Sequence, residues 1–240
     1  MAVRKYDPTI PIRDENGNYA LGRIYGLAQN PASILDATIL TQKDNLLTSA
    51  FLDIMPAKGL VVKTTVGYDR KFASTGAYFP MTTQEGINAN GGIAKINENN
   101  LSNYYINMTA TYNKTFANDH ALTLMAGWEY QKVVSESLSG ENRGFPYDGV
   151  KWHNLDLGTY EKPIASSSKT TDQNASFIAR LNYTYKDRYL VTATLRADGA
   201  SNFAKNNRWG YFPSFSAGWR ISEEDFMENT HGWLQSLKLR

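Results

Sequence analysis

The chain has 240 residues, which is enough for one or two ordinary domains. It contains no cysteine, so disulfides, thiolate metal sites and a cysteine nucleophile are excluded. The formal net charge of +2 is too small to indicate a nucleic-acid partner, and no window approaches the roughly 18 consecutive apolar residues of a membrane helix.

The first thirty residues contain charges and prolines but no apolar run of the signal-peptide type. Asp14 to Asn18 superficially resembles a calcium-binding loop. Its glycine is misplaced and the distal glutamate is absent, so we predict an Asn-Gly turn instead. A membrane barrel must be exported, so the chain is either not a barrel or not complete.

Alternation of apolar and polar residues begins before the middle of the chain. We predict a weak strand over Thr48–Ile54 and stronger strands over residues 60–68, 104–113 and 121–130. In the last of these, the apolar positions are Leu122, Leu124, Ala126, Trp128 and Tyr130. Period-two alternation over about ten residues is typical of a strand with one apolar and one wet face.

The strongest alternation covers residues 177–221, in three runs over 177–185, 189–198 and 211–221. One face carries apolar side chains, and the other carries Arg, Asn, Thr and Ser. We expect the following to face lipid if the protein is a membrane barrel: Leu181, Tyr183, Val191, Leu195, Phe215 and Trp219.

Two kinds of connection alternate along the chain. Residues 56–58, 117–119 and 186–188 are short and polar, as hairpin turns are, whereas residues 71–100 and 137–174 are long and rich in Gly, Asn and Ser. Outer-membrane barrels have short periplasmic turns and long outer loops, so Leu60 to Tyr68 would run outward. The connection 222–236 is an exception, and we predict a small helix capped at Ser222.

Aromatic residues make up 12% of the chain and collect near the predicted turns. Tyr185 and Tyr189 flank one turn, while Tyr112 and Phe116 precede another. Aromatic rings with one wet edge gather at membrane interfaces, which favours a barrel. A soluble β-sandwich also places Tyr at strand ends and stays an alternative.

The stretch RADGASNFAKNNRWGYFPSFSAGWRISEEDFM, Arg196 to Met227, resembles a segment of the SusC/RagA family of TonB-linked outer-membrane proteins of Bacteroidota. Ala200 and Ala204 replace the usual Ser and Gly. The preceding YKDRYLVTATLR is similar to the family's previous strand. The likeness is sharp over the last quarter of the chain and diffuse elsewhere.

The resemblance implies an all-β fold, an antiparallel transmembrane barrel of about 22 strands around an N-terminal plug, of which about eight strands lie here with long outer loops. Residues 1–240 would be a partial barrel domain that lacks the signal peptide, plug, TonB-contacting segment and final strands. The implied partners are TonB, through the plug, a SusD-like surface lipoprotein, and outer-membrane lipid in a Gram-negative bacterium.

No catalytic, metal or cofactor residue is predicted. His120, His153 and His231 lack metal-ligand spacing, and we interpret them as surface or turn residues. The sequence contains no G-x-S-x-G motif and no phosphate-binding glycine loop, so we predict no enzyme and no cofactor.

Asp198 to Trp209 is the one segment in which chemistry can be argued. Charges and rings gather there, namely Arg196, Asp198, Lys205, Arg208, Phe203 and Trp209. They could contact ligand, but we favour a structural role in which an Asp198-Gly199 bend and Arg-carboxylate pairing hold two strands in register. Among the long loops Trp152, Tyr147 and Tyr160 could stack on cargo, although no single substrate-binding residue can be assigned.

The predicted function is the barrel portion of an importer of oligomeric nutrients, glycans or peptides. One alternative is a soluble or cell-surface β-rich carbohydrate-binding module, and another is a small closed outer-membrane barrel of about eight strands. Apolar-face residues packed against a second sheet would contradict the membrane hypothesis.

Overall fold

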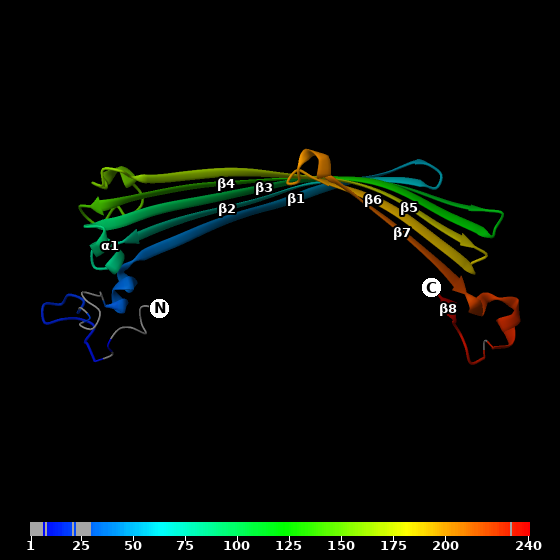
Figure 1. Ribbon diagram of the computed structural model, residues 1–240, viewed down its shortest axis with the longest axis horizontal. Coiled ribbons are helices and arrows are strands. Elements are labelled where there is room, and N and C mark those ends of the chain that lie inside the picture. The colour runs from blue at the N-terminus through cyan, green and yellow to red at the C-terminus, as the bar shows by residue number, and fades with distance from the viewer. Residues whose placement is uncertain (1–6, 8, 21, 23–29, 231) are drawn as a thin grey trace. The chain divides into compact units, whose positions relative to one another are not determined.

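The computed structural model describes residues 7, 9–20, 22, 30–230 and 232–240. Those residues form one antiparallel sheet whose strands follow one another in chain order (Figure 1). The strands are β1 (Thr38–Ala57), β2 (Leu60–Phe79), β3 (Gly92–Phe116), β4 (His120–Phe145), β5 (Ile164–Tyr185), β6 (Tyr189–Ala200), β7 (Trp209–Arg220) and β8 (Lys238–Leu239). The order runs from β1 to β8 without joining the two, so the described sheet is open.

Helical segments in the described residues are short and lie in the connections. They are η2 (Pro31–Asp36), α1 (Gln84–Asn88), η3 (Leu155–Leu157), η4 (Lys205–Asn207), η5 (Ile221–Glu223) and η6 (Asp225–Thr230). Within the described ranges no helix has the length and apolar character needed to cross a membrane. The prediction of an all-β, antiparallel fold is confirmed.

The chain divides into two compact units. One comprises Met1–Asn45, Arg70–Leu101 and Ser135–Thr170, and the other comprises Leu46–Asp69, Ser102–Val134 and Thr171–Arg240. Each long strand from β1 to β5 contributes one part to each unit. The second unit contains the whole of β6, β7 and β8, and with them the segment that resembles the SusC/RagA family.

In the second unit the strand register confirms the two faces that the alternation predicts. Leu181 pairs with Ala193, which pairs with Phe215, so the apolar positions of three strands form one continuous face. On the other face, Asn182 pairs with Thr192 and Thr192 with Ser216. Because side chains alternate along a strand, this register separates apolar from polar residues across the sheet.

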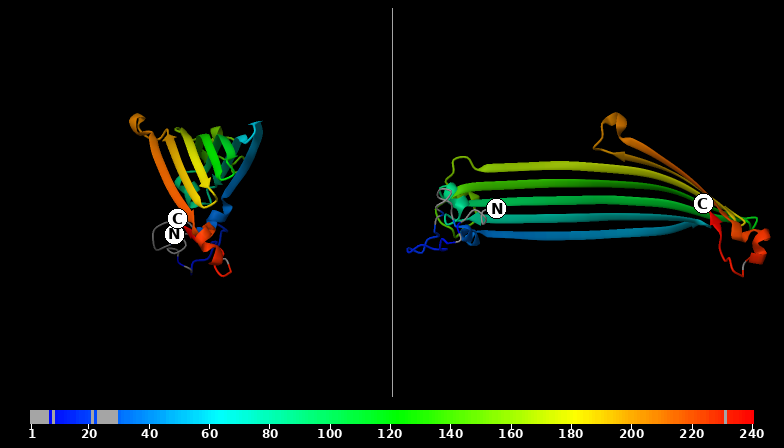
Figure 2. Two further views of the ribbon diagram at one scale, coloured as in Figure 1. Left: turned by 90° about the vertical axis from the view of Figure 1, so that its right-hand side faces the viewer. Right: turned by 60° about the horizontal axis from the view of Figure 1, so that its bottom comes forward.

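The tight turns lie together at one end of the second unit (Figure 1, Figure 2). At one of them the Arg188 N–H donates to the Tyr185 carbonyl over 3.0 Å, and Lys186 and Asp187 both have positive φ, 51° and 53°. This is the pattern of a type I′ hairpin turn, which matches the twist of the flanking strands. The predicted hairpin turn at residues 186–188 is therefore confirmed.

The first unit has a small core where its parts of β2, β3 and β4, those farthest from the tight turns along each strand, meet a loop. Tyr78, only 1% exposed, meets Phe145 edge-on at 5.8 Å between ring centroids, and its hydroxyl donates to Asp148 over 2.8 Å. Trp152 packs against this cluster from the connection after β4. The loop is thus held to the strands by buried apolar contacts as well as by a hydrogen bond.

The strands are longer than the alternation predicts. Residues 71–79 and 92–100, which we expected in a loop, extend β2 and β3, and residues 137–145 and 164–174 extend β4 and β5. Polar pairs across neighbouring strands stabilise these extensions, including Glu136 with Lys169 at 2.7 Å and Lys95 with Glu141 at 2.8 Å. Apolar and polar residues do not alternate regularly there, so hydrophobic alternation does not report the strands.

Three smaller predictions concern a turn near the N-terminus, a helix after β7 and a histidine. The Asn-Gly turn is confirmed, since the Asp14 carboxylate accepts the N–H groups of Asn16 and Asn18, each over 2.9 Å. Helical turns follow β7 as predicted, but they are 3₁₀ turns and the residue at the first cap is Arg220, not Ser222. His231 lies outside the described residues.

Candidate functional site

The polar face of the second unit is joined by side-chain hydrogen bonds between neighbouring strands. The Asn107 amide donates to Glu129 over 2.8 Å, and the Thr192 hydroxyl donates to Asn182 over 2.9 Å. Arg180 donates to the Thr194 hydroxyl over 3.3 Å. No buried side-chain nitrogen or oxygen of the described residues lacks a partner, so the polar face is internally satisfied.

Arg196 is the centre of this network. Its Nε lies 2.8 and 2.9 Å from the two carboxylate oxygens of Asp198 on the same strand. Its Nη2 lies 3.3 Å from Glu129 on β4 and 3.3 Å from the Ser176 hydroxyl on β5. One guanidinium therefore connects three neighbouring strands, as its planar fork of donors allows.

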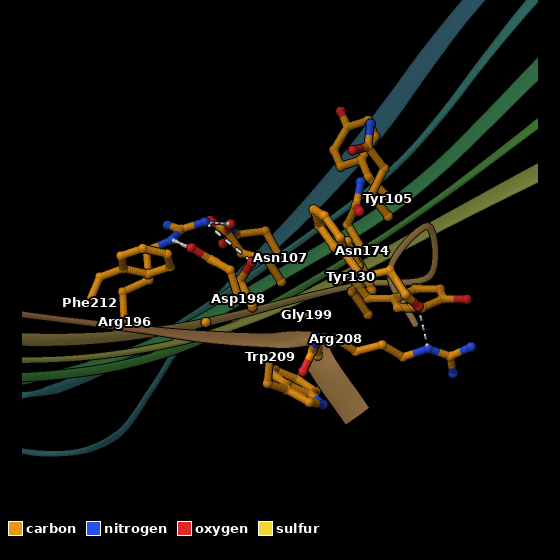
Figure 3. Close-up of a pocket in the computed structure, with 18 residues that line it drawn as sticks. Tyr105, Asn107, Tyr130, Asn174, Arg196, Asp198, Gly199, Arg208, Trp209 and Phe212 are labelled. Carbon is orange, nitrogen blue, oxygen red and sulfur yellow. Dashed lines mark hydrogen bonds and ion pairs between the residues drawn. The ribbon is translucent and has the colours of Figure 1, made fainter. Parts of the chain in front are cut away.

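A pocket of about 820 Å³ opens around Arg196 (Figure 3). Polar groups and rings line it together, including Tyr105, Asn107, Gln131, Asn174, Phe203, Arg208 and Phe212. Figure 3 shows Asp198 and Asn107 on one side of the strands and Trp209 on the other. Rings beside amides and a guanidinium suit a polar, extended molecule better than a purely apolar one.

The structure brings together most of the residues that the sequence singled out in this segment. Arg196, Asp198, Phe203, Arg208 and Trp209 all line the pocket, whereas Lys205 does not. Arg196 pairs with Asp198, but both residues lie on β6, so this pair does not join two strands as predicted. The pair that joins different strands is Arg196 with Glu129.

The predicted bend at Asp198-Gly199 is wrong. Both residues belong to β6 and pair with Gly210 and Trp209 on β7. Gly199 leaves room for the Trp209 ring of the paired strand, since a β-carbon there would lie only 2.9 Å from the indole. The Trp209 ring also stacks with Phe177, at 5.9 Å between centroids.

Sequence reasoning missed the pocket residues contributed by β3, β4 and the outer part of β5, namely Tyr105, Asn107, Glu129, Gln131 and Asn174. They lie 22–91 residues away from Arg196 along the chain and meet it only through the sheet register. One signal was present, since Glu129 is the single charged residue in the predicted strand 121–130.

The aromatic residues predicted to meet cargo separate into two groups. Trp152 packs against the core of the first unit, so its ring contributes to the packing of that core. Tyr147 and Tyr160 are exposed, and the Arg143 guanidinium lies 5.6 Å from the Tyr160 ring centroid. Neither position assigns a tyrosine to a ligand.

The histidines have structural contacts. His120 stacks on Phe116 at 4.8 Å, and its Nδ1 lies 2.6 Å from the Tyr183 hydroxyl. His153 lies beside Trp152 in the connection after β4. In the described ranges no three His, Cys, Asp or Glu side chains are grouped so as to hold a metal ion.

Two rows of rings cross the apolar face of the second unit. The inner ring row, beside the tight turns, consists of Phe116, His120, Tyr185, Tyr189 and Trp219, with successive centroids 4.8–6.5 Å apart. The outer ring row consists of Tyr68, Tyr104, Trp128, Tyr130, Phe177 and Trp209. The rows run across successive strands at two levels of the same sheet.

Eight to twelve residues separate the two rows on the strands that carry rings of both, which are β3, β4, β5 and β7. Trp209 and Trp219 are ten residues apart, as are His120 and Tyr130. At about 3.3 Å per residue and a strand tilt of about 40°, ten residues span roughly 25 Å. That is close to the height of the apolar band of an outer-membrane barrel, about 25 Å between its aromatic girdles.

Glu224 joins the inner ring row to the segment that follows β7. Its Oε1 accepts the Tyr189 hydroxyl over 2.7 Å and the Trp219 indole N–H over 2.9 Å. Its Oε2 accepts Arg188 over 2.9 Å. These hydrogen bonds, followed by the Arg188 charge, hold the pKa of Glu224 below its ordinary value.

The family model described as "TonB dependent receptor-like, beta-barrel" matches residues 6–233. TonB-dependent receptor P26 of Formosa agariphila is 32% identical over 97% of the chain, which covers 24% of that relative. TonB-dependent receptor SusC of Bacteroides thetaiotaomicron is 33% identical over 63% of the chain and 14% of its own length.

Solved structures agree on the fold. The RagAB peptide transporter aligns over 90% of the chain and 24% of its own, with a TM-score of 0.75 and 22% identity. The RagAB peptide importer in its open-open state aligns over 94% and 25%, with a TM-score of 0.76.

The chain spans about a quarter of the length of the first curated relatives that it matches. Those relatives are receptors by name and not enzymes, which confirms the prediction of a non-enzymatic protein. The match over residues 6–233 leads to one conclusion: the chain belongs to the TonB-dependent receptor β-barrel family.

Proposed function

We propose that residues 1–240 form part of the wall of an outer-membrane importer for oligomeric nutrients, either glycans or peptides. The observation that carries the proposal is the pair of ring rows on one apolar face, at a separation that fits the apolar band of the outer membrane. The opposite face, with its hydrogen-bonded network around Arg196, would face the water-filled lumen.

Burial in lipid accounts for apolar side chains that no described residue covers. Phe215 is 72% exposed and lies between the two ring rows with Leu195 and Leu181 on neighbouring strands. Each Leu or Phe side chain left in water forgoes about 1.5–3 kcal/mol of burial free energy. A soluble β-rich module would cover this face with a second sheet, and the described residues form a single sheet.

The remaining parts of the importer are proposed from the family resemblance. The wall would belong to a barrel of about 22 strands around a plug that receives energy from TonB, with a SusD-like surface lipoprotein as a lid. The tight turns would lie in the periplasm and the connections 80–91 and 146–163 outside the cell. Residues 1–240 would then be one portion of the barrel domain.

The placement of the two faces can be tested by labelling. Thr194 and Leu195 are adjacent on β6 but belong to the polar and the apolar face. In the full-length receptor in lipid vesicles, with other cysteines removed, Thr194→Cys should react with a membrane-impermeant maleimide and Leu195→Cys should not. Equal labelling of the two positions would rule out a membrane wall.

Transport needs a separate assay. A deletion strain complemented with the full-length gene should recover uptake of labelled oligosaccharides or oligopeptides, and an energy-deficient strain lacking TonB should not. Recovery with one class only would identify the cargo class. Uptake of neither class, with normal labelling of the wall, would contradict the importer function but leave the membrane placement intact.

A further inference from the structure

The connection after β7 is exceptional among those at the tight-turn end of the second unit. It contains two 3₁₀ turns and runs to β8, whereas the neighbouring connections are hairpin turns (Figure 1, Figure 2). Two large rings in it are largely exposed, Phe226 at 66% and Trp233 at 77%. Exposed Trp and Phe rings beside an aromatic row are typical of a membrane interface, and the proposed membrane placement suggests that role for them.

Glu224 determines the side of the wall on which this connection begins. Tyr189 and Trp219 both lie on the apolar face, where they pair across β6 and β7. Their hydroxyl and indole N–H both donate to the same oxygen of Glu224. The Glu224 carboxylate is therefore beside the apolar face, not the polar one.

Arg188 fixes the connection from the adjoining hairpin turn. Its two terminal nitrogens contact Glu224 over 2.9 Å and Asp225 over 2.5 Å. In addition, the Ser222 N–H donates to the Leu237 carbonyl over 3.2 Å, which joins the two ends of the connection. Phe226 directly follows this anchored pair of carboxylates in the chain.

From this geometry we infer that the connection 221–237 is a membrane-surface anchor, in which Phe226 and Trp233 enter the phospholipid headgroup region at the periplasmic side. The inference rests on the proposed membrane wall. The occupant is the lipid surface because the connection continues an apolar face bounded by an aromatic row, and exposed Trp and Phe rings partition to that interface.

Depth-resolved fluorescence quenching tests the anchor in the full-length receptor, reconstituted in phosphatidylethanolamine–phosphatidylglycerol vesicles. An environment-sensitive fluorophore is placed at Phe226→Cys or Trp233→Cys, with Phe215→Cys and Ser216→Cys as apolar-face and polar-face controls. Shallow spin-labelled lipids should quench positions 226 and 233 more than deep ones do, and the order should reverse at 215.

The outcomes separate the anchor from the membrane wall. Lipid quenching at 215, with only aqueous iodide quenching at 226 and 233, overturns the anchor and keeps the wall. If neither lipid nor iodide quenches the fluorophore at 226 and 233, protein covers these positions, and this outcome also overturns the anchor. Absence of lipid quenching at 215 overturns both proposals.

Glu224→Gln provides a second test that does not depend on the rings themselves. The variant weakens the contacts with Arg188, Tyr189 and Trp219, so shallow-lipid quenching at 226 should fall while deep-lipid quenching at 215 stays unchanged. Unchanged quenching at 226 would contradict the role given to Glu224 in holding the connection.

Discussion

Replacing Phe215 with arginine gives the sharpest test of the membrane wall. Phe215 faces Ala193, which lies five residues beyond the turn residue Arg188. At about 3.4 Å per residue and a tilt of about 40°, the side chain is roughly 13 Å from the turn, near the middle of an apolar band about 25 Å tall. Arginine on the lipid face at that depth costs about 2–4 kcal/mol of unfolding free energy.

The matched control is Ser216→Arg, one residue further along on the polar face opposite Thr192. It should change the unfolding free energy by less than about 0.5 kcal/mol, as exposed substitutions usually do. Urea-induced unfolding of the full-length receptor in phospholipid vesicles measures both variants. If Phe215→Arg were tolerated as well as Ser216→Arg, the assignment of the two faces would be wrong.

Three further predictions use features described above. Arg196→Ala should lower the unfolding free energy by about 1–2 kcal/mol, because it removes two partly exposed ion pairs, each worth up to about 1 kcal/mol, and a hydrogen bond. The loss should shrink at high salt. A salt-independent loss would contradict the electrostatic explanation. The pKa of Glu224 is lowered in the folded state, so its stabilisation is fully present above the ordinary carboxyl pKa and is lost as pH falls through the lowered value. Acid titrations of stability should therefore be flatter in Glu224→Gln, and identical pH profiles would count against the hydrogen bonds to that carboxylate. Replacing Lys186-Asp187 by Asn-Gly should raise the unfolding free energy by about 1 kcal/mol, since both positions have positive φ and Asn-Gly is the preferred type I′ pair. If chemical denaturation showed no gain, the backbone conformation of this turn would not limit the stability of the protein.

The sequence predicts the two faces of the strands of the second unit well, for a physical reason. Between the two ring rows one face of the sheet is apolar and the other polar, so residues such as Leu195 and Arg196 report their faces directly. A shift of one residue would exchange the two faces, so the alternation excludes odd shifts from the pairing that the structure has, and the tight turns fix the rest.

The outer parts of the strands could not be predicted in the same way. From Ser166 to Thr171 every side chain is hydroxylic or charged, so the two faces of β5 do not differ. The backbone ladder and polar pairs such as Ser137 with Ser168, 2.8 Å apart, stabilise the sheet there. Such pairs depend on which strands are neighbours, and a single sequence carries little information about that.

For a related reason, only the part of the pocket from β6 and β7 lies in a segment that the sequence singles out. Its β6 and β7 residues, such as Asp198 and Trp209, lie close together in the sequence and were found as one segment. Tyr105 and Glu129 come from strands that reach Arg196 only across the assembled sheet. The bend predicted at Gly199 failed because that glycine accommodates a ring on the next strand, not a turn.

The strict two-residue period of β5, β6 and β7 also restricts how the gene can change. Deletion of one codon within residues 189–200 would transpose every later side chain of β6, placing Arg196 where Leu195 packs and losing the three-strand contact. Insertions within residues 146–163 leave the strand pairing of the second unit untouched. Length variation among relatives should therefore accumulate in the connections, which leaves the wall as a fixed frame on which new specificities can evolve.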